Sequence, residues 1–287
     1  MLTLFRWFAR WPLWLLHAVG ALLGWLTFWA SPSYRARFRA NVAQAGISPA
    51  DARPAIAHAG RMLMELPFLW LRPAGQAIRP RLDWQGEALL TEALARGKGI
   101  LLLTPHMGSF EVTAQACAQS FAAEFGPITV LFRPARKAWV RALMDGSRER
   151  PGVTTAPATL AGVRQMIRAL RRGEAVGLLP DQVPPDGMGV WVPFFGKPAY
   201  TMTLAARLVQ QTGATPLLIW GERLPRGAGF RVQVSALPEA LPLADPTQAE
   251  SSAVINRAMA QLIRQCPQQY LWGYDRYKTP RSVTKAA

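Results

Sequence analysis

His106 and Glu111 are the two residues whose types and spacing point most directly to chemistry. They begin and end the segment HMGSFE, which follows the apolar run 99–104. A carboxylate bonded to one nitrogen of an imidazole ring fixes the tautomer and makes the other nitrogen more basic. Such a pair can take the proton from a hydroxyl and so make its oxygen nucleophilic. The segment therefore predicts general-base chemistry on a hydroxyl.

The elements around the pair decide whether both side chains can face one substrate. Positions i and i+5 of a regular helix lie roughly 140° apart, so His106 must lie in a loop and Glu111 in the first helical turn. Pro105 and Gly108 are residues that such a loop uses, and a carboxylate near a helix N-terminus is favoured by the helix dipole. A purely structural His–Glu pair and a nucleophilic Ser109 are the alternatives, although Ser109 lacks the G-x-S-x-G elbow.

The rest of the chain supplies the elements for such a site. Two helices are expected first, at 33–47 and 51–72, and from residue 81 short apolar runs alternate with helical patterns. This alternation predicts an α/β sheet covered by helices on both faces, with functional residues where strands end. The expected strands are 81–86, 99–104, 128–132, 175–179, 215–221 and 230–237; the expected helices are 87–96, 111–125, 138–146, 160–172, 202–212 and 247–265.

Composition narrows the class of protein. The 287 residues are 50% hydrophobic and 17% charged, with a formal net charge of +16, which implies an anionic partner. The sequence has no zinc-finger spacing, no RNP-type strand and no lysine block, so nucleic acid is not expected as that partner. Two cysteines cannot form a disulfide framework. No spaced cluster of ligands joins His106, so we expect no metal.

The N-terminal segment predicts membrane attachment. Residues 11–30 contain no Asp, Glu, Lys or Arg, and five tryptophans fall between residues 7 and 29. Twenty residues at helical rise cover roughly 30 Å, the thickness of the hydrocarbon core of a bilayer. A cleaved signal peptide is disfavoured, because Phe28 stands where cleavage needs a small residue. A transmembrane helix and an interfacial helix are both open, and a buried core helix is the third reading.

Further segments extend the pattern around His106. They are LFRP at 131–134, the stretch 162–174, LPDQ at 179–182, WVPFFG at 191–196, QYLW at 269–272 and RYK at 276–278. Together with the segment 106–111, they resemble the lipid A acyltransferases of Gram-negative bacteria, the lauroyl and myristoyl transferases. These belong to the His-x4-Asp/Glu glycerolipid acyltransferase superfamily. The resemblance extends over nearly the whole chain.

This resemblance implies a fold and a reaction. The fold is an α/β domain with a central mixed sheet flanked by helices, preceded by a hydrophobic membrane helix. The reaction is transfer of a fatty acyl chain from acyl carrier protein, or from acyl-CoA, to a hydroxyl of an anionic, already acylated glycolipid. No cofactor is implied, and membrane lipid is a partner. The implied location of the protein is the bacterial inner membrane, with the catalytic domain on the cytoplasmic face.

The resemblance also gives roles to individual residues. His106 would deprotonate the acceptor hydroxyl, and Glu111 would orient and stabilise His106. Asp181 matches the acidic residue after a later strand and would bind substrate, although a turn residue explains it as well. Four arginines are further candidates for substrate binding: Arg133, Arg148, Arg150 and Arg164. Either Arg148 or Arg150 corresponds to one basic position of the family, because the alignment of this segment with the family admits both.

Three interpretations stay open. Residues 133–172 carry ten lysines and arginines against two acidic residues, a patch that suits sugar phosphates, an acidic carrier protein or simply an anionic membrane surface. The acceptor is open, because segment 273–276 lacks a histidine that family members often have. Acylation of another lipid, such as a lysophospholipid or aminolipid, and a non-catalytic basic membrane protein are the alternatives.

We divide the chain into a membrane anchor, residues 1–31, and an acyltransferase domain, residues 32–287.

Overall fold

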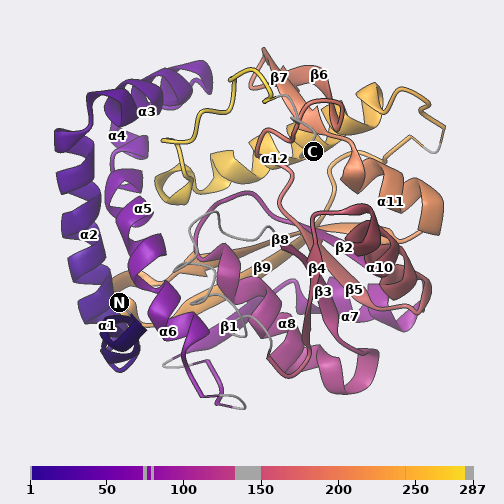
Figure 1. The fold of residues 1–287 in the computed structure, drawn as a ribbon, viewed down its shortest axis with the longest axis horizontal. Helices are drawn as coiled ribbons and strands as arrows, with labels where there is room; N and C mark the ends of the chain where they lie inside the picture. Colours follow the sequence, from indigo (N-terminus) through magenta and orange to yellow (C-terminus); the bar gives the residue numbers. More distant parts are fainter. Residues whose placement is uncertain (1, 74–75, 79–80, 133–149, 243, 282–287) are drawn as a thin grey trace, which may run out of the picture.

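A sheet of seven strands within the described residues forms the centre of the molecule (Figure 1). The computed structural model describes residues 2–73, 76–78, 81–132, 150–242 and 244–281. The strand order is β1-β9-β8-β2-β5-β3-β4, and neighbouring strands are parallel except β8 and β9. The strands are β1 (Leu82–Gln85), β2 (Ile100–Leu103), β3 (Ile128–Phe132), β4 (Val153–Pro157), β5 (Ala175–Leu178), β8 (Thr215–Arg223) and β9 (Phe230–Ala236).

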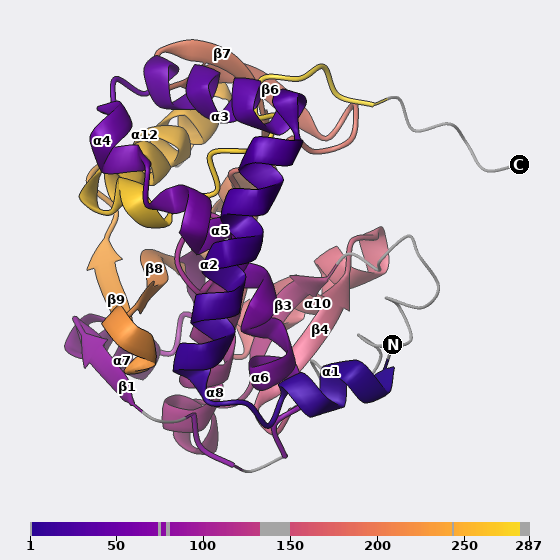
Figure 2. The same ribbon diagram turned by 90° about the vertical axis from the view of Figure 1, so that its left-hand side faces the viewer.

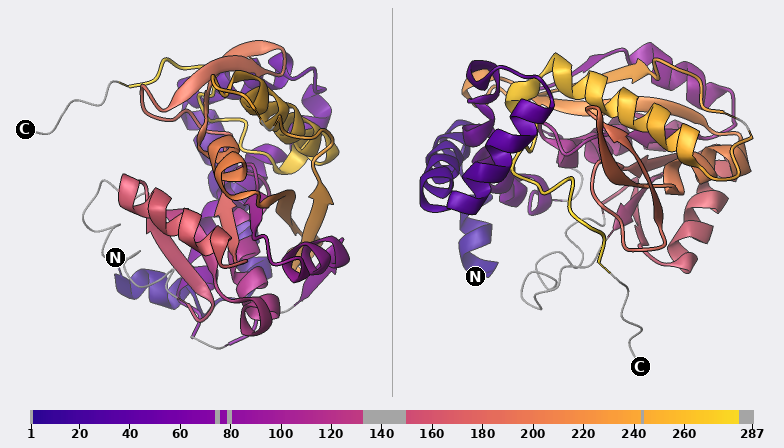
Figure 3. Two further views of the ribbon diagram at one scale, coloured as in Figure 1. Left: turned by 90° about the vertical axis from the view of Figure 1, so that its right-hand side faces the viewer. Right: turned by 90° about the horizontal axis from the view of Figure 1, so that it is seen from above.

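Helices cover both faces of the sheet because its central strands are apolar throughout. Every residue of β2 is buried, as expected of a parallel strand covered on both sides. Side chains of α7 (Glu87–Ala95) and α8 (Phe110–Phe125) pack on one face. Those of α10 (Leu160–Arg171), α11 (Leu204–Thr212) and α12 (Ala249–Gln265) pack on the other face, where α12 crosses the sheet (Figure 3). The predicted mixed α/β sheet flanked by helices is confirmed.

The apolar N-terminal helix packs against the rest of the protein (Figure 2). Helix α2 (Leu13–Ala30) is long and apolar enough to cross a membrane, by length and composition. It runs beside α5 (Ala55–Met64). Gly20 and Gly24 of α2 meet backbone atoms of α5, where a larger side chain would collide. The inner face of α2 is therefore part of the packed molecule.

The segment 51–72, predicted as one helix, is divided into shorter helices. These are the end of α4 (Pro49–Ala52), then α5, then α6 (Leu66–Trp70). Pro54 and Pro67 lack the backbone N–H that a continuous helix requires, so the helix is interrupted near each. The predicted helix 33–47 is confirmed by α3 (Pro32–Gln44). Helix α1 (Leu2–Phe8) precedes α2.

Most predicted elements after residue 80 are confirmed, and two features are new. One is β4, in which two threonines and a terminal proline interrupt the apolar pattern that predicts a strand. The other is the antiparallel hairpin of β6 (Gly189–Phe194) and β7 (Lys197–Met202). Its turn needs left-handed backbone at Phe195 and Gly196. The predicted helix 138–146 lies outside the described residues.

Candidate active site

The loop between β2 and α8 holds His106 outside regular structure and Glu111 in the first helical turn, as predicted. Its shape depends on Gly108, whose φ of +56° lies in the left-handed region that favours glycine. A Cβ at this position would also collide with the backbone oxygen of Gly221 in β8. The loop is therefore packed directly against β8.

His106 forms two hydrogen bonds with Asp181. The ring Nδ1 lies 2.7 Å from Oδ1 of Asp181, and the backbone N–H of His106 donates to Oδ2 at 2.9 Å. Because an ionised carboxylate can only accept hydrogen bonds, Nδ1 carries the ring proton and Nε2 keeps its lone pair. Nε2 is therefore the nitrogen that can act as a base.

The strand register explains how these two residues meet. Strands β2 and β5 are parallel neighbours in which Leu103 pairs with Leu178. His106 follows Leu103 by three residues (103 to 106), and Asp181 follows Leu178 by three residues (178 to 181). Each also directly follows a proline. This shared pattern, an apolar run and then a proline and a polar residue, is the sequence signal that could have paired them.

Asp181 lies behind the ring of His106 rather than on an open surface, because only 2% of it is exposed. Burial alone would raise the pKa of Asp181. The charge and hydrogen bonds of His106 and the charge of Arg276 outweigh burial and hold that pKa below its usual value. The phenol of Tyr270 also lies beside the carboxyl group. Asp181, which the sequence led us to expect as a substrate-binding residue, thus contacts the ring and backbone of His106.

Glu111 meets a different partner. Its Oε2 accepts a hydrogen bond of 3.2 Å from the indole N–H of Trp70. Arg150 donates to the backbone oxygens of Trp70, at 2.8 Å, and of Arg72, at 2.7 Å. In the described part of the chain, the carboxylate hydrogen-bonded to His106 is that of Asp181. Arg150 and Glu111 are instead connected through Trp70.

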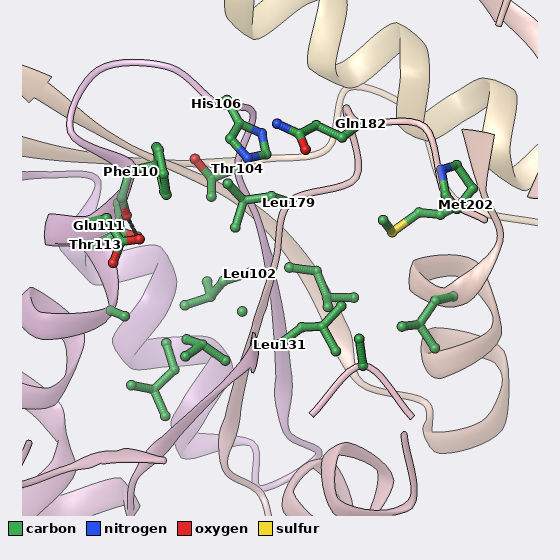
Figure 4. Close-up of a pocket in the computed structure, with 18 of the residues that line it drawn as sticks. Leu102, Thr104, His106, Phe110, Glu111, Thr113, Leu131, Leu179, Gln182 and Met202 are labelled. Carbon is green, nitrogen blue, oxygen red and sulfur yellow. Dashed lines mark hydrogen bonds between the residues drawn. The ribbon is translucent and has the colours of Figure 1, made fainter. Parts of the chain in front are cut away.

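A cavity of about 470 Å³ opens beside His106 (Figure 4). It lies where two strands separate, because the pairing of β3 with β5 ends at Val130 and Gly177, whereas β3 stays paired with β4 to Phe132. His106 and Glu111 line the cavity on its polar side. Its apolar walls include Leu102, Phe110, Ala114, Ile128, Leu131, Val163, Leu178, Leu179 and Met202.

The other candidates from the sequence are distributed differently. Arg164 is exposed on α10, one residue after Val163 of the cavity wall. Arg133 and Arg148 lie outside the described residues. Ser109, the alternative nucleophile, is fully buried, so a substrate cannot reach its hydroxyl. The geometry therefore favours His106 over Ser109 as the reactive side chain.

Comparison with known proteins identifies the kind of enzyme. A model of the bacterial lipid A biosynthesis acyltransferase family matches residues 2–279. The chain belongs to this family. It is 28% identical over 227 residues to the lipid A biosynthesis lauroyltransferase of Escherichia coli K12, covering 77% of this chain and 69% of that protein. It is 26% identical over 223 residues to the palmitoleoyltransferase of lipid A biosynthesis from the same strain, with 77% and 69% covered.

Members of this lipid A biosynthesis acyltransferase family are enzymes, so the protein is an acyltransferase. Acyl transfer to an alcohol needs a base for the attacking hydroxyl and room for an acyl chain. The pair formed by His106 and Asp181 offers the first, and the apolar cavity beside it offers the second.

Proposed function

We propose that the protein transfers a fatty acyl chain from acyl carrier protein to a hydroxyl of a lipid A precursor, with His106 as general base. The observation that carries this proposal is the bonded pair of His106 and Asp181 beside an apolar cavity. Family membership supplies the reaction class, and the names of the two relatives favour lipid A as the acceptor. The donor is inferred from the resemblance of the sequence, which leaves acyl-CoA as the alternative donor.

The transfer needs one proton relay. Nε2 of His106 takes the proton of the acceptor hydroxyl while its oxygen attacks the carbonyl carbon of the thioester. The new C–O bond forms, the C–S bond breaks, and the proton passes from His106 to the leaving thiolate. Asp181 keeps the ring in the tautomer that can accept the proton and stabilises the charged ring. Glu111 lies on the wall of the same cavity, held there by the hydrogen bond from Trp70.

The cavity is suited to an acyl chain. Its walls are mostly aliphatic and aromatic side chains from α8, α10 and the central strands, and such surface is released from water when a hydrocarbon chain fills it. Gly177 keeps the floor open, because a Cβ there would lie 3.3 Å from Cγ1 of Val130. The acyl chain of the donor is therefore proposed to lie across Gly177, with its thioester beside His106.

Exposed cations near the cavity suit an anionic partner. Arg164, Arg168 and Arg171 of α10 are exposed, and Leu160 at the start of the same helix lines the cavity. Arginine binds phosphates with paired hydrogen bonds and also attracts acidic protein surfaces. This helix is accordingly proposed to bind either the phosphates of the glycolipid or acyl carrier protein.

The outer face of α2 is proposed to lie in the membrane. Trp14 and Trp29 near its two ends are 57% and 62% exposed, and Leu22, Leu23 and Leu26 between them are 44–58% exposed. Tryptophan favours the interface between headgroups and hydrocarbon, and leucine favours the hydrocarbon. Acyl carrier protein is a cytoplasmic donor, so the membrane concerned is proposed to be the inner one, approached from its cytoplasmic face.

Mass spectrometry of the lipids from a strain that lacks this protein tests the proposal. The expected lipid A is lighter by one acyl chain, and the wild-type protein restores its mass whereas His106→Ala does not. Unchanged lipid A together with an altered phospholipid or aminolipid would overturn lipid A as the acceptor. Restoration by His106→Ala would overturn the proposed chemistry.

A further inference from the structure

A buried ion pair lies behind the loop that carries His106. It joins Glu65, which follows α5, to Arg223, the last residue of β8, and the side chains of both are 1% exposed. Nε of Arg223 donates to Oε2 of Glu65 at 2.7 Å, and Nη2 donates to Oε1 at 2.8 Å. The proton relay proposed above uses neither residue.

The same guanidinium also holds the catalytic loop. Nη2 of Arg223 donates a hydrogen bond to the backbone oxygen of Gly108, which lies between His106 and Glu111. A single arginine therefore connects the turn after His106 to the carboxylate of Glu65.

Gln269 completes the support from the other side. The N–H of Gly108 donates to the backbone oxygen of Gln269 at 2.9 Å. The side chain of Gln269 in turn bonds both backbone groups of Arg223, accepting from its N–H at 3.0 Å and donating to its oxygen at 3.2 Å. Both backbone groups of Gly108 are thus bonded to residues that are bonded to each other.

Helix α2 also contributes to this support. Nε2 of His17 lies 3.3 Å from Oε2 of Glu65. Burial lowers the pKa of His17, and the nearby cations Arg223 and Arg61 lower it further against the opposing effect of Glu65. A neutral His17 can donate Nε2–H to the Glu65 carboxylate. The apolar N-terminal helix is therefore connected to the catalytic loop through three side chains and one backbone oxygen.

The position of this ion pair distinguishes it from an ordinary stabilising contact. Burying two charges costs solvation energy that their attraction often only offsets, so apolar residues could fill the space as well. Apolar residues could not bond the Gly108 oxygen, which would then be a buried acceptor without its donor. The arrangement thus makes sense as a means to fix the loop.

We infer that Arg223 and Glu65 are positioning residues, which hold the turn at Gly108 so that His106 faces the cavity, and that His17 of α2 belongs to the same support. The inference rests on the proposed function, because it takes His106 as the base. A displacement of about 1 Å at a catalytic group can reduce turnover by about 100-fold. The effect of losing Arg223 should therefore appear in kcat.

Arg223→Lys, Glu65→Gln and His17→Ala test the inference, with Arg257→Lys and Glu239→Gln as matched controls. Arg257 and Glu239 form a similar two-bond ion pair at the surface, with side chains 52% and 45% exposed. We expect Arg223→Lys and Glu65→Gln to lower kcat about 10- to 100-fold at nearly constant KM, and the controls to be unchanged. His17→Ala should lower kcat as well. His17→Gln, whose amide can still donate a hydrogen bond to Glu65, should keep most of the kcat that His17→Ala loses.

Two further readouts separate positioning from general destabilisation. In the His106→Ala background, Arg223→Lys should cause no additional loss of the residual rate, whereas an equal loss in both backgrounds would overturn the inference. Amide hydrogen exchange of the substrate-free Arg223→Lys protein should be faster than that of the wild type in residues 106–111 and equal to it in α12. Unchanged exchange at 106–111 would overturn the inference whichever acceptor is used. Faster exchange there without any acyl transfer by the wild type would instead contradict the proposed function alone.

Discussion

Nδ1 of His106 and Oδ1 of Asp181 lie 2.7 Å apart because their strands, β2 and β5, are parallel neighbours in register. Each residue stands at the same distance beyond its strand, so the two side chains leave the sheet together. Their bond gives Nε2 of His106 the lone pair that a general base requires. The basic nitrogen is thus set by a long-range strand pairing and not by the segment 106–111 alone.

Asp181→Asn should lower kcat by about 100- to 10,000-fold with KM nearly unchanged, because the amide can no longer hold His106 in the required tautomer. Steady-state kinetics of the purified protein measure the effect. Asp51→Asn, at an exposed position in α4, is the control. Turnover within about twofold of the wild type would show that Asp181 does not orient the base.

Trp70→Phe should lower kcat about threefold to tenfold, since it removes one hydrogen bond to Glu111 that contributes about 1 kcal/mol. The phenyl ring keeps most of the packing in a site where Trp70 is 7% exposed. Trp191→Phe, at an exposed tryptophan of β6, should leave the kinetics unchanged. Equal effects of the two substitutions would argue against a role for the indole N–H at Glu111.

Gly177→Val should shift the donor preference toward shorter acyl chains. The new side chain would press on Val130 and fill the cavity floor, and a misfit of one or two methylenes changes kcat/KM by about 10- to 100-fold. Competition between donors of different chain length measures the preference. Ala236→Val, at the exposed end of β9, is the control. An unchanged preference would place the acyl chain elsewhere.

Stability should fall as the pH drops below 6.5 because of His58. Burial lowers the pKa of His58 from 6.5 to about 2, and Arg223 and Arg61 add to the shift. At pH values between these two pKa values, His58 binds a proton in the unfolded chain but stays neutral in the folded protein. Stability that is fully present above pH 6.5 is therefore lost toward lower pH, by up to about 1.4 kcal/mol per pH unit.

His58→Gln should make this slope shallower by the share that His58 contributes, because glutamine can accept the hydrogen bond of Arg61 without titrating. Denaturant unfolding at pH 7.5, 6.5, 5.5 and 4.5 measures the free energy of unfolding. A variant whose stability falls as steeply as that of the wild type in this interval would contradict the prediction.

Trp14→Gln combined with Trp29→Gln should weaken binding to vesicles that contain anionic lipid, without a change in Tm, because both side chains are exposed on α2. Flotation of the protein with vesicles measures the bound fraction. Trp191→Gln, at an exposed tryptophan of the β6–β7 hairpin, is the control. An equal loss in the control would show that α2 has no special part in binding.

The sequence predicts the local elements of this protein better than the contacts between them. Strand 128–132 and the loop position of His106 follow from apolar runs, Pro105 and Gly108, which act over a few residues. The hydrogen bond of His106 to Asp181 depends on which strands become neighbours. The proline and polar residue after each apolar run mark both as candidates, but the runs themselves do not give the strand order. The ion pair of Glu65 and Arg223 could not be predicted from the sequence for the same reason, since its partners are 158 residues apart.

Other contacts also join distant parts of the chain. His58 of α5 is half-buried, and its Nδ1 lies 3.3 Å from Nη1 of Arg223, 165 residues further along the chain. Asp181 was expected to bind substrate, and its contact with the ring of His106 depends in the same way on the pairing of β2 with β5.

Acyl transfer by the purified His106→Ala protein, compared with the wild type on an acyl carrier protein thioester and a lipid A precursor, is the most direct test of the central claim. The account predicts that the wild type adds one acyl chain to the acceptor, seen by mass spectrometry. It predicts that His106→Ala, with an unchanged Tm and unchanged vesicle binding, is at least about 1,000-fold slower. Turnover by the variant at the wild-type rate would contradict His106 as the general base.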